Sequence, residues 1–145
     1  MIGQHVDVIS VKTRGQGFID VTGDVARWLS AGRAGDGLVT LFLRHTSASL
    51  TIQENADPDV LRDLGDTLDR LAPRDLPYFH GSEGPDDMPA HIRTMLTATS
   101  LAVPVKAGAM LLGTWQAIYL VEHRDRPHRR EIALHFIGET GGLSL

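Results

Sequence analysis

Short apolar segments with the character of β-strands recur along this 145-residue chain, and only three helical patterns interrupt them. The strand-like segments are residues 6–11, 18–21, 38–43, 49–52, 101–105, 110–112, 117–121 and 132–137. Strands and helices do not alternate regularly, as they would in a doubly wound parallel sheet. The order therefore predicts the α+β class, and the length fits a single domain over residues 1–145.

Local signals predict how the first elements connect. Gly15-Gln16-Gly17 separates the first two strands and is typical of a turn, so we expect the chain to open with a β-hairpin. Thr22 can cap a short helix that runs to Leu29. The run from Leu38 to Leu43 is continuously apolar and indicates a central strand.

Two further helices carry clear start signals. Asp57 followed by Pro58 combines a capping residue with proline at the first helical position. Leucines at helical spacing follow until Pro73, with charged residues between them. Pro89 starts the third helix. Residues 74–87 between these helices form a long loop, and such loops inside compact domains are often functional.

Composition excludes several classes of protein. The chain has no cysteine, which excludes disulfides and thiol catalysis, and its net charge of −4 argues against nucleic-acid binding. The N-terminus lacks the blocks of a signal peptide, and no apolar run is long enough to span a bilayer. We therefore expect a cytoplasmic protein. A local cluster of arginines can either meet a phosphate or form a solvated turn: Arg124, Arg126, Arg129 and Arg130.

Three of the seven histidines stand in contexts that suggest chemistry. His45 ends an apolar strand, His80 lies in the long loop, and His91 lies in the first turn of the third helix. Ligands from such elements can converge, and three imidazoles with an open fourth position resemble a catalytic zinc site. The alternative is that each histidine is a polar residue hydrogen-bonded at a loop or strand end. The remaining histidines are expected at the surface or in turns: His5, His123, His128 and His135.

Other polar residues suggest a site for an anion. Thr46 and Ser47 follow His45, and small hydroxyls at a strand end can bind phosphate oxygens. Gly113-Thr114-Trp115-Gln116 is a polar break in an apolar stretch, which is either a binding segment or a β-bulge with a packing tryptophan. Glu54 is a candidate general base or ligand. Asn55 is a candidate anion-binding residue, or it simply shapes a turn.

Three segments together resemble a known family. They are His45-Thr46-Ser47-Ala48-Ser49-Leu50-Thr51-Ile52-Gln53-Glu54-Asn55-Ala56-Asp57-Pro58, then Tyr78-Phe79-His80 with Glu83-Gly84-Pro85-Asp86-Asp87-Met88-Pro89-Ala90-His91-Ile92, and Pro104-Val105 with Gly113-Thr114-Trp115-Gln116. The chain closely resembles the YjbQ-like family, often labelled secondary thiamine-phosphate synthase enzymes. The resemblance covers essentially the whole chain.

The resemblance implies sandwich-like mixed sheets with a few helices packed on one side, assembled as a homotrimer with a histidine-rich site near a subunit boundary. It implies a divalent metal, zinc first, held by His45, His80 and His91. The residues around them are then Glu54, Asn55, Thr114 and Gln116. The family often has asparagine where this chain has Asp87, and the extra carboxylate can either bind metal or weaken phosphate binding.

The leading hypothesis is a small cytosolic enzyme with weak thiamine-phosphate synthase activity. A pyrimidine methyl diphosphate is joined to a thiazole phosphate, and pyrophosphate leaves. His45, Glu54 and Gln116 are the catalytic candidates. The anion-binding candidates are Thr46, Ser47, Asn55, Thr114 and Arg124. The alternatives are a non-catalytic trimeric binding or regulatory module for a small anionic ligand, or an unrelated metal-dependent hydrolase.

Overall fold

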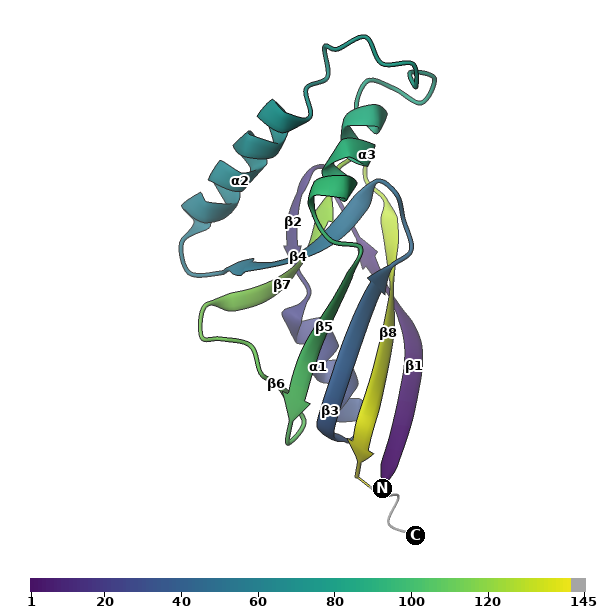
Figure 1. Ribbon diagram of the computed structural model, residues 1–145, viewed down its shortest axis with the longest axis vertical. Helices are drawn as coiled ribbons and strands as arrows, with labels where there is room; N and C mark the ends of the chain where they lie inside the picture. The colour runs from purple at the N-terminus through teal and green to yellow at the C-terminus, as the bar shows by residue number, and fades with distance from the viewer. Residues whose placement is uncertain (142–145) are drawn as a thin grey trace.

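Two antiparallel sheets and three helices make up the computed structural model, which describes residues 1–141 (Figure 1). The five-stranded sheet has the order β1-β8-β3-β5-β6, and the three-stranded sheet has the order β2-β7-β4. The elements are β1 (Ile2–Lys12), β2 (Gly17–Asp20), α1 (Thr22–Ala31), β3 (Ala34–Leu43), β4 (Ala48–Glu54), α2 (Pro58–Leu71), α3 (Asp87–Leu96), β5 (Ser100–Lys106), β6 (Ala109–Met110), β7 (Gln116–Glu122) and β8 (Arg129–Thr140). The predicted α+β class is confirmed.

The core lies between the two sheets and α1. Alternate residues of β3 and β8 point inward, which is why Leu41, Leu134 and Phe136 are fully buried. Val25 and Leu29 of α1 complete this core. The predicted central strand, 38–43, is confirmed, because β3 pairs with β8 on one side and with β5 on the other.

The predicted opening hairpin is wrong. All eleven residues of β1 pair with β8, whereas β2 pairs with β7 in the other sheet. The segment between them crosses from one sheet to the other, and the backbone N–H of Thr13 donates to the carbonyl of His128 at 2.8 Å. The turn at residues 15–17 is therefore a crossover between sheets rather than a hairpin loop.

Two helix starts differ from the predicted ones. The residue before α1 is Val21, and the hydroxyl of Thr22 accepts the backbone N–H of Ile118 at 2.8 Å instead of capping the helix. Helix α3 begins at Asp87, two residues before Pro89. Helix α2 begins as predicted, and the carboxylate of Asp57 accepts the N–H of Asp59 at 2.9 Å.

Helix α2 is amphipathic, yet none of its residues is fully buried. Figure 1 shows it standing to one side of the molecule, joined to α3 by the long loop. Arg93 of α3 donates to the carboxylate of Asp69 on α2 at 2.6 Å. A polar contact rather than deep apolar packing thus contributes to holding this helix in place.

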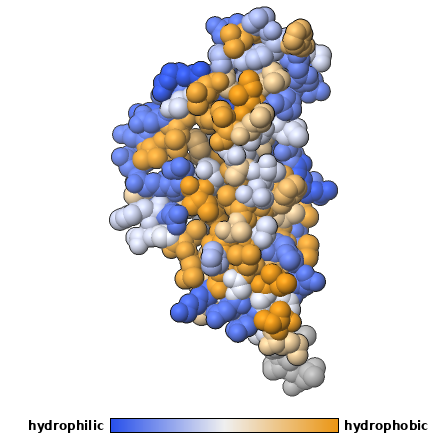
Figure 2. Space-filling view, viewed as in Figure 1, coloured by the Kyte–Doolittle hydropathy of each residue, from blue (hydrophilic) through white to orange (hydrophobic). Residues whose placement is uncertain are grey.

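One face of the five-stranded sheet carries exposed apolar side chains. Val8 of β1 is paired with Ala133 of β8, which is paired on its other side with Phe42 of β3. Leu38 of β3 is paired with Ile137 of β8. Phe42 is 50% exposed, and Figure 2 shows hydrophobic side chains gathered over this side of the molecule. Exposed patches of this kind are typical of association surfaces. No helix among the described residues is both long and apolar enough to cross a membrane.

Replacing Gly65 in α2 should stabilise the protein. A Cβ at this position meets no atom within 4 Å, and alanine is favoured over glycine in a helix interior by about 1 kcal/mol. We expect Gly65→Ala to raise the free energy of unfolding by about 1 kcal/mol, measured by urea denaturation. The control is Gly37→Ala, whose Cβ clashes with the carbonyl oxygen of Ile137. An unchanged or lower stability of Gly65→Ala would contradict the helix packing described here.

Candidate functional site

Three side chains at the start of α3 form a compact cluster. The Nε2 atom of His80 lies 2.6 Å from Oδ2 of Asp87, and Nε2 of His91 lies 3.2 Å from the same oxygen. Asp87 and His91 are four residues apart, so they share one face of the helix. His80 reaches them from the long loop. Donor atoms of the three residues all lie within 4.8 Å of one another, close enough to hold one metal ion.

The hydrogen bonds of His91 require a proton or a cation between its ring and Asp87. Its Nδ1 lies 2.9 Å from the carbonyl oxygen of Thr46, which can only accept, so Nδ1 carries the proton. In the neutral ring Nε2 then directs a lone pair at the carboxylate oxygen of Asp87. The Nε2 atom of His91 and the Oδ2 atom of Asp87 lie 3.2 Å apart, and they attract each other only when a proton or a cation lies between them. A carbonyl bound to the second ring nitrogen is the usual support of a metal-ligating histidine.

Arg124 fixes the acidic residues of this cluster. Its NH1 lies 2.8 Å from Oδ1 of Asp87, and its Nε donates to Oδ2 of Asp86 at 2.9 Å. Burial opposes ionisation of Asp86, but the hydrogen bonds from Arg124 and from the N–H of Asp125 lower its pKa to about 2. Burial likewise opposes ionisation of Asp87, but its hydrogen bond with His80 and the charge of Arg124 hold its pKa below the ordinary value.

The guanidinium of Arg124 is therefore already engaged. Besides the two carboxylates, it donates to the backbone carbonyl of Glu83 at 2.9 Å. Within the chain it orients the carboxylates of Asp86 and Asp87, and its predicted role in anion binding stays a prediction. Asp87 was not among the three ligands expected from the resemblance, although metal binding was one of the two alternatives for its carboxylate. Its spacing from His91 on one helical face is a signal for that alternative that the sequence contains.

His45 does not join the cluster of His80 and His91 in the described chain. Its Nε2 accepts the backbone N–H of Glu131 at 2.7 Å. Burial and the charge of Arg130 lower the pKa of His45, so the ring is neutral near pH 7 and carries its proton on Nδ1. Nδ1 lies 3.5 Å from NH1 of Arg130. Two N–H groups therefore face each other there, an arrangement that a shared acceptor from a ligand satisfies.

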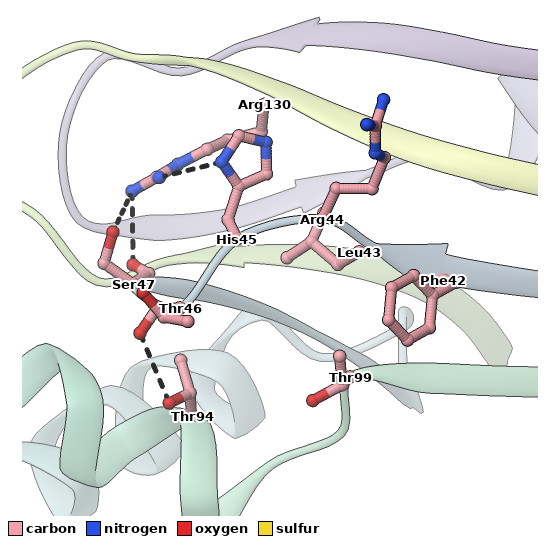
Figure 3. A pocket seen from close by; sticks show the side chains of 9 residues that line it. All are labelled: Phe42, Leu43, Arg44, His45, Thr46, Ser47, Thr94, Thr99 and Arg130. Atoms are coloured by element: carbon pink, nitrogen blue, oxygen red, sulfur yellow. Dashed lines mark hydrogen bonds between the residues drawn. The ribbon is translucent and has the colours of Figure 1, made fainter.

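His45 and Arg130 line a pocket of about 530 Å³, shown in Figure 3. Arg44 and Arg130 contribute positive charge, and Phe42 and Leu43 contribute apolar wall. Hydroxyl groups come from the remaining polar lining residues: Thr46, Ser47, Thr94 and Thr99. Charge, hydroxyls and an apolar wall suit a small anionic molecule with an apolar part. The carbonyl of Thr46 binds His91, so the pocket adjoins the cluster on α3.

Arg130 is positioned by a buried ion pair with Glu122. Its Nε donates to Oε2 of Glu122 at 2.7 Å, and its NH2 contacts the other carboxylate oxygen. The same NH2 donates to the hydroxyl of Ser47 at 2.9 Å. No local pattern in the sequence indicates this contact, because Ser47 and Arg130 are 83 residues apart.

The other predicted site residues lie at the far end of β4. Glu54 is paired with Gln116 in the register of β4 and β7, six residues along the strand from Ala48. At about 3.3 Å per residue this places them roughly 20 Å from the pocket end. Glu54 accepts the N–H of Asp57 at 3.3 Å, and Gln116 accepts the N–H of Gly113 at 2.7 Å.

Asn55 and Thr114 lie at this same end. The backbone N–H of Asn55 donates to the carbonyl of Trp115 at 2.9 Å, and Thr114 is exposed. One chain thus separates the predicted site residues into two groups, one around His45, His80 and His91 and one around Glu54 and Gln116.

The family follows from sequence comparison. The sequence model of the family described as UPF0047 protein YjbQ-like matches residues 7–139. The chain belongs to this family. It is 47% identical over 138 residues to UPF0047 protein sll1880 of Synechocystis sp., covering 94% of both chains. It is 41% identical over 132 residues to UPF0047 protein YjbQ of Escherichia coli O157:H7, covering 90% of this chain and 96% of the relative.

Solved structures of similar proteins share the fold. A YjbQ/UPF0047 family protein of Clostridium acetobutylicum is 37% identical, with a TM-score of 0.82 over 90% of this chain and 98% of that one. A protein of Sulfolobus solfataricus is 21% identical, with a TM-score of 0.87 over 96% of this chain and 100% of that one, and shows the shared fold alone. These comparisons establish the family and the fold, and the names of the relatives state no activity.

His123 was expected near the surface, but it is buried. Its side chain is 1% exposed, and its Nε2 lies 2.8 Å from the hydroxyl of Ser49. Burial, helped by the charge of Arg93, lowers the pKa of His123 to about 4. His123 follows directly after β7, whose last residue, Glu122, is buried as well.

Acidification should therefore destabilise the protein. Because the pKa of His123 is lowered on folding, the unfolded state binds the extra proton between pH 6.5 and about 4. We expect the protonation linked to His123 to lower the free energy of unfolding by about 3 kcal/mol as the pH falls through this window. In His123→Gln the free energy of unfolding, measured in urea at several pH values, should vary less over this range. An equally steep pH dependence in the variant would contradict the assignment to His123.

Proposed function

We propose that this protein is a small metal-dependent enzyme acting on a phosphorylated small molecule. His80, Asp87 and His91 would hold a divalent cation, zinc being the first candidate because two imidazoles and a carboxylate leave a fourth position open. The observation that carries the proposal is the contact of one Asp87 oxygen with both Nε2 atoms. In this assignment Asp87 replaces His45 among the three ligands first expected.

The neighbouring pocket supports an anionic substrate. Arg44 and Arg130 supply positive charge, and the N–H groups of His45 and Arg130 face a common point. The hydroxyls of Thr46 and Ser47 lie in the same lining. Such donors, fixed before the substrate arrives, stabilise charge that develops on a leaving group. His45 would thus act on the substrate rather than on the metal.

The finer activity we propose is the weak thiamine-phosphate synthase reaction of the family resemblance. The C–O bond between the pyrimidine methylene and its diphosphate breaks, and the electron pair leaves with pyrophosphate. The nitrogen of the thiazole phosphate supplies the pair for the new C–N bond. Arg130, His45 and Ser47 would hold the departing pyrophosphate. A divalent cation, when bound, would neutralise part of its charge.

We further propose a homotrimer in which neighbouring subunits complete the site. The exposed apolar face of the five-stranded sheet, with Val8, Leu38 and Phe42, supports association. Phe42 also lines the pocket, so this face is continuous with it. Glu54 and Gln116 lie roughly 20 Å away within one chain, so they can reach the pocket only from another subunit. Their proposed role is to position or deprotonate the substrate, with Asn55 and Thr114 beside them.

A second candidate is a non-catalytic trimeric module that binds a small anion. It is favoured by the ion pairs of Arg130 with Glu122 and of Arg124 with Asp86, which give rigid donors without a general base in the same pocket. The histidines would then serve only as hydrogen-bond donors.

The metal assignment makes a measurable prediction. Protein purified without an affinity tag should contain about one divalent ion per chain, measured by elemental analysis. His91→Ala and Asp87→Ala should lose most of it, since each removes one of three ligands. His45→Ala should keep it, because His45 lies outside the cluster. Metal absent from the parent protein, or lost equally in His45→Ala, would refute this ligand set.

Turnover and subunit sharing can be tested together. Purified protein given the pyrimidine and thiazole substrates should release pyrophosphate, and His91→Ala and Glu54→Ala should each be at least about tenfold slower. Refolding the two variants together should restore part of the activity, because mixed trimers contain some intact sites. Anion binding without turnover would favour the binding module. A monomer in sedimentation, or turnover unchanged in both variants, would refute the shared site.

A further inference from the structure

An apolar groove of about 480 Å³ lies between helix α2, the end of α3 and strand β4. Its volume is in the range of about 300–1,000 Å³ that is typical of ligand sites. Its walls include Ile52, Leu71 and Leu96, and none of the described residues that line it carries a charge. It shares no lining residue with the pocket at His45. The groove is therefore separate from the site proposed above.

One wall of this groove is a free strand edge. Strand β4 lies at the end of the three-stranded sheet, where it pairs with β7 (Figure 1). On its other side, the one pairing among residues 1–141 is a bridge in which Leu50 and Ala98 exchange backbone hydrogen bonds of 2.7 and 3.1 Å. The backbone N–H and C=O groups of alternate residues in a strand point to the same side. Because Leu50 points away from β7, Ile52 and Glu54 point away from it as well.

The hydrogen bonds of β7 agree with this direction. Ile52 is paired with Ile118 of β7. The carbonyl of Ile118 accepts the N–H of Val21 at 2.9 Å, and its own N–H donates to the hydroxyl of Thr22 at 2.8 Å. Both backbone groups of Ile118 are thus turned away from Ile52. Since Ile52 lines the groove together with Ala98, which lies across the free edge, the unpaired backbone groups of β4 border the groove.

Helix α2 forms the opposite wall and leaves its apolar side chains uncovered. A surface helix normally buries its apolar stripe against the core. Leu64, Leu68 and Leu71 of α2 line the groove, yet no residue of this helix is fully buried and Leu71 is 58% exposed. Leu96, at the end of α3, is 53% exposed. An occupant of the groove would remove this apolar surface from water.

We propose that the groove binds an extended segment of another protein, which adds to β4 as a further strand. Its backbone would bond with Ile52 and Glu54, while every second side chain would contact Leu71 and Leu96. Those side chains would be apolar, because an uncharged lining provides no partner for a buried charge. The two helices flank the edge, so a single extended chain fits there better than the edge strand of a second folded copy. Strand addition of this kind is a recurrent mode of peptide recognition.

An acetylated and amidated hexapeptide of alternating threonine and valine is a suitable probe. In the isotope-labelled full-length protein it should shift the NMR amide signals of Ile52 and Glu54 saturably. Two methylated forms test the geometry, one N-methylated on its valines and one on its threonines. Because alternate N–H groups point to opposite sides of a strand, one form should bind at least about tenfold more weakly than the other. No shifts with the unmodified peptide, or equal binding of the two forms, would overturn strand addition.

Two leucine variants of similar exposure locate the peptide. Leu71 lines the groove and is 58% exposed, whereas Leu76 lies in the long loop outside the lining and is 51% exposed. Leu71→Lys should weaken peptide binding at least about tenfold, and Leu76→Lys should bind as the parent does. Gln53→Glu places a charge in the groove from β4 without changing α2, and it should weaken binding similarly.

The same variants separate the proposal from its alternatives. Binding that is unchanged in both Leu71→Lys and Gln53→Glu, or lost equally in Leu76→Lys, would place the peptide elsewhere and refute the groove as its site. Self-association of the parent protein that disappears in Leu71→Lys but persists in Leu76→Lys, measured by sedimentation, would assign the groove to a second copy of the chain and would also overturn the proposal.

Discussion

The buried ion pair between Glu122 and Arg130 holds the two sheets and the pocket in one arrangement. Glu122 ends β7 of the three-stranded sheet, and Arg130 belongs to β8 of the five-stranded sheet. The hydroxyl of Thr13, where the chain crosses between the sheets, donates to the same carboxylate at 2.8 Å. Burial opposes ionisation of Glu122, but the hydrogen bond from Arg130 keeps its pKa below the ordinary value. Removing one member of such a pair leaves a buried charge without a partner, which typically lowers the stability of the fold by about 3–5 kcal/mol.

The candidate metal cluster depends on a different part of the chain. The long loop brings His80 to α3, and the bidentate ion pair of Arg74 with Asp125 joins that loop to the connection between β7 and β8. Arg124 from the same connection orients Asp86 and Asp87. The loop is therefore held by charge at both ends and not by an apolar core of its own. This explains how an exposed segment can present His80 in a defined position.

Local patterns in the sequence were sufficient for most elements and insufficient for their pairing. The proline after Asp57 predicts the start of α2 because capping is a matter of adjacent residues. The hairpin prediction failed because the register of β1 is decided by β8, more than a hundred residues away. Residue spacing alone cannot reveal such partners.

The same distinction applies to the site. The motifs that contain His80 and His91 lie close together in the chain, and the structure brings these residues together. His45 and Arg130 are brought together by the antiparallel pairing of β3 with β8, which places Leu43 opposite Ile132. The burial of His123 was also missed, because its neighbours Ser49 and Arg93 come from distant segments. The sequence thus indicated which residues are polar and clustered in motifs, but not which of them share one centre.

Thr46 lines the pocket, and its carbonyl oxygen is hydrogen-bonded to His91 of the candidate metal cluster. Any ligand that shifts this peptide changes the orientation of the imidazole, and any occupant of the cluster that fixes the imidazole restrains the peptide. Occupants of the two places would be thermodynamically linked, because a change that one of them causes in the affinity for the other must be reciprocal. A single shared peptide group would thus couple the two binding events, so the affinity of each occupant would depend on whether the other is bound.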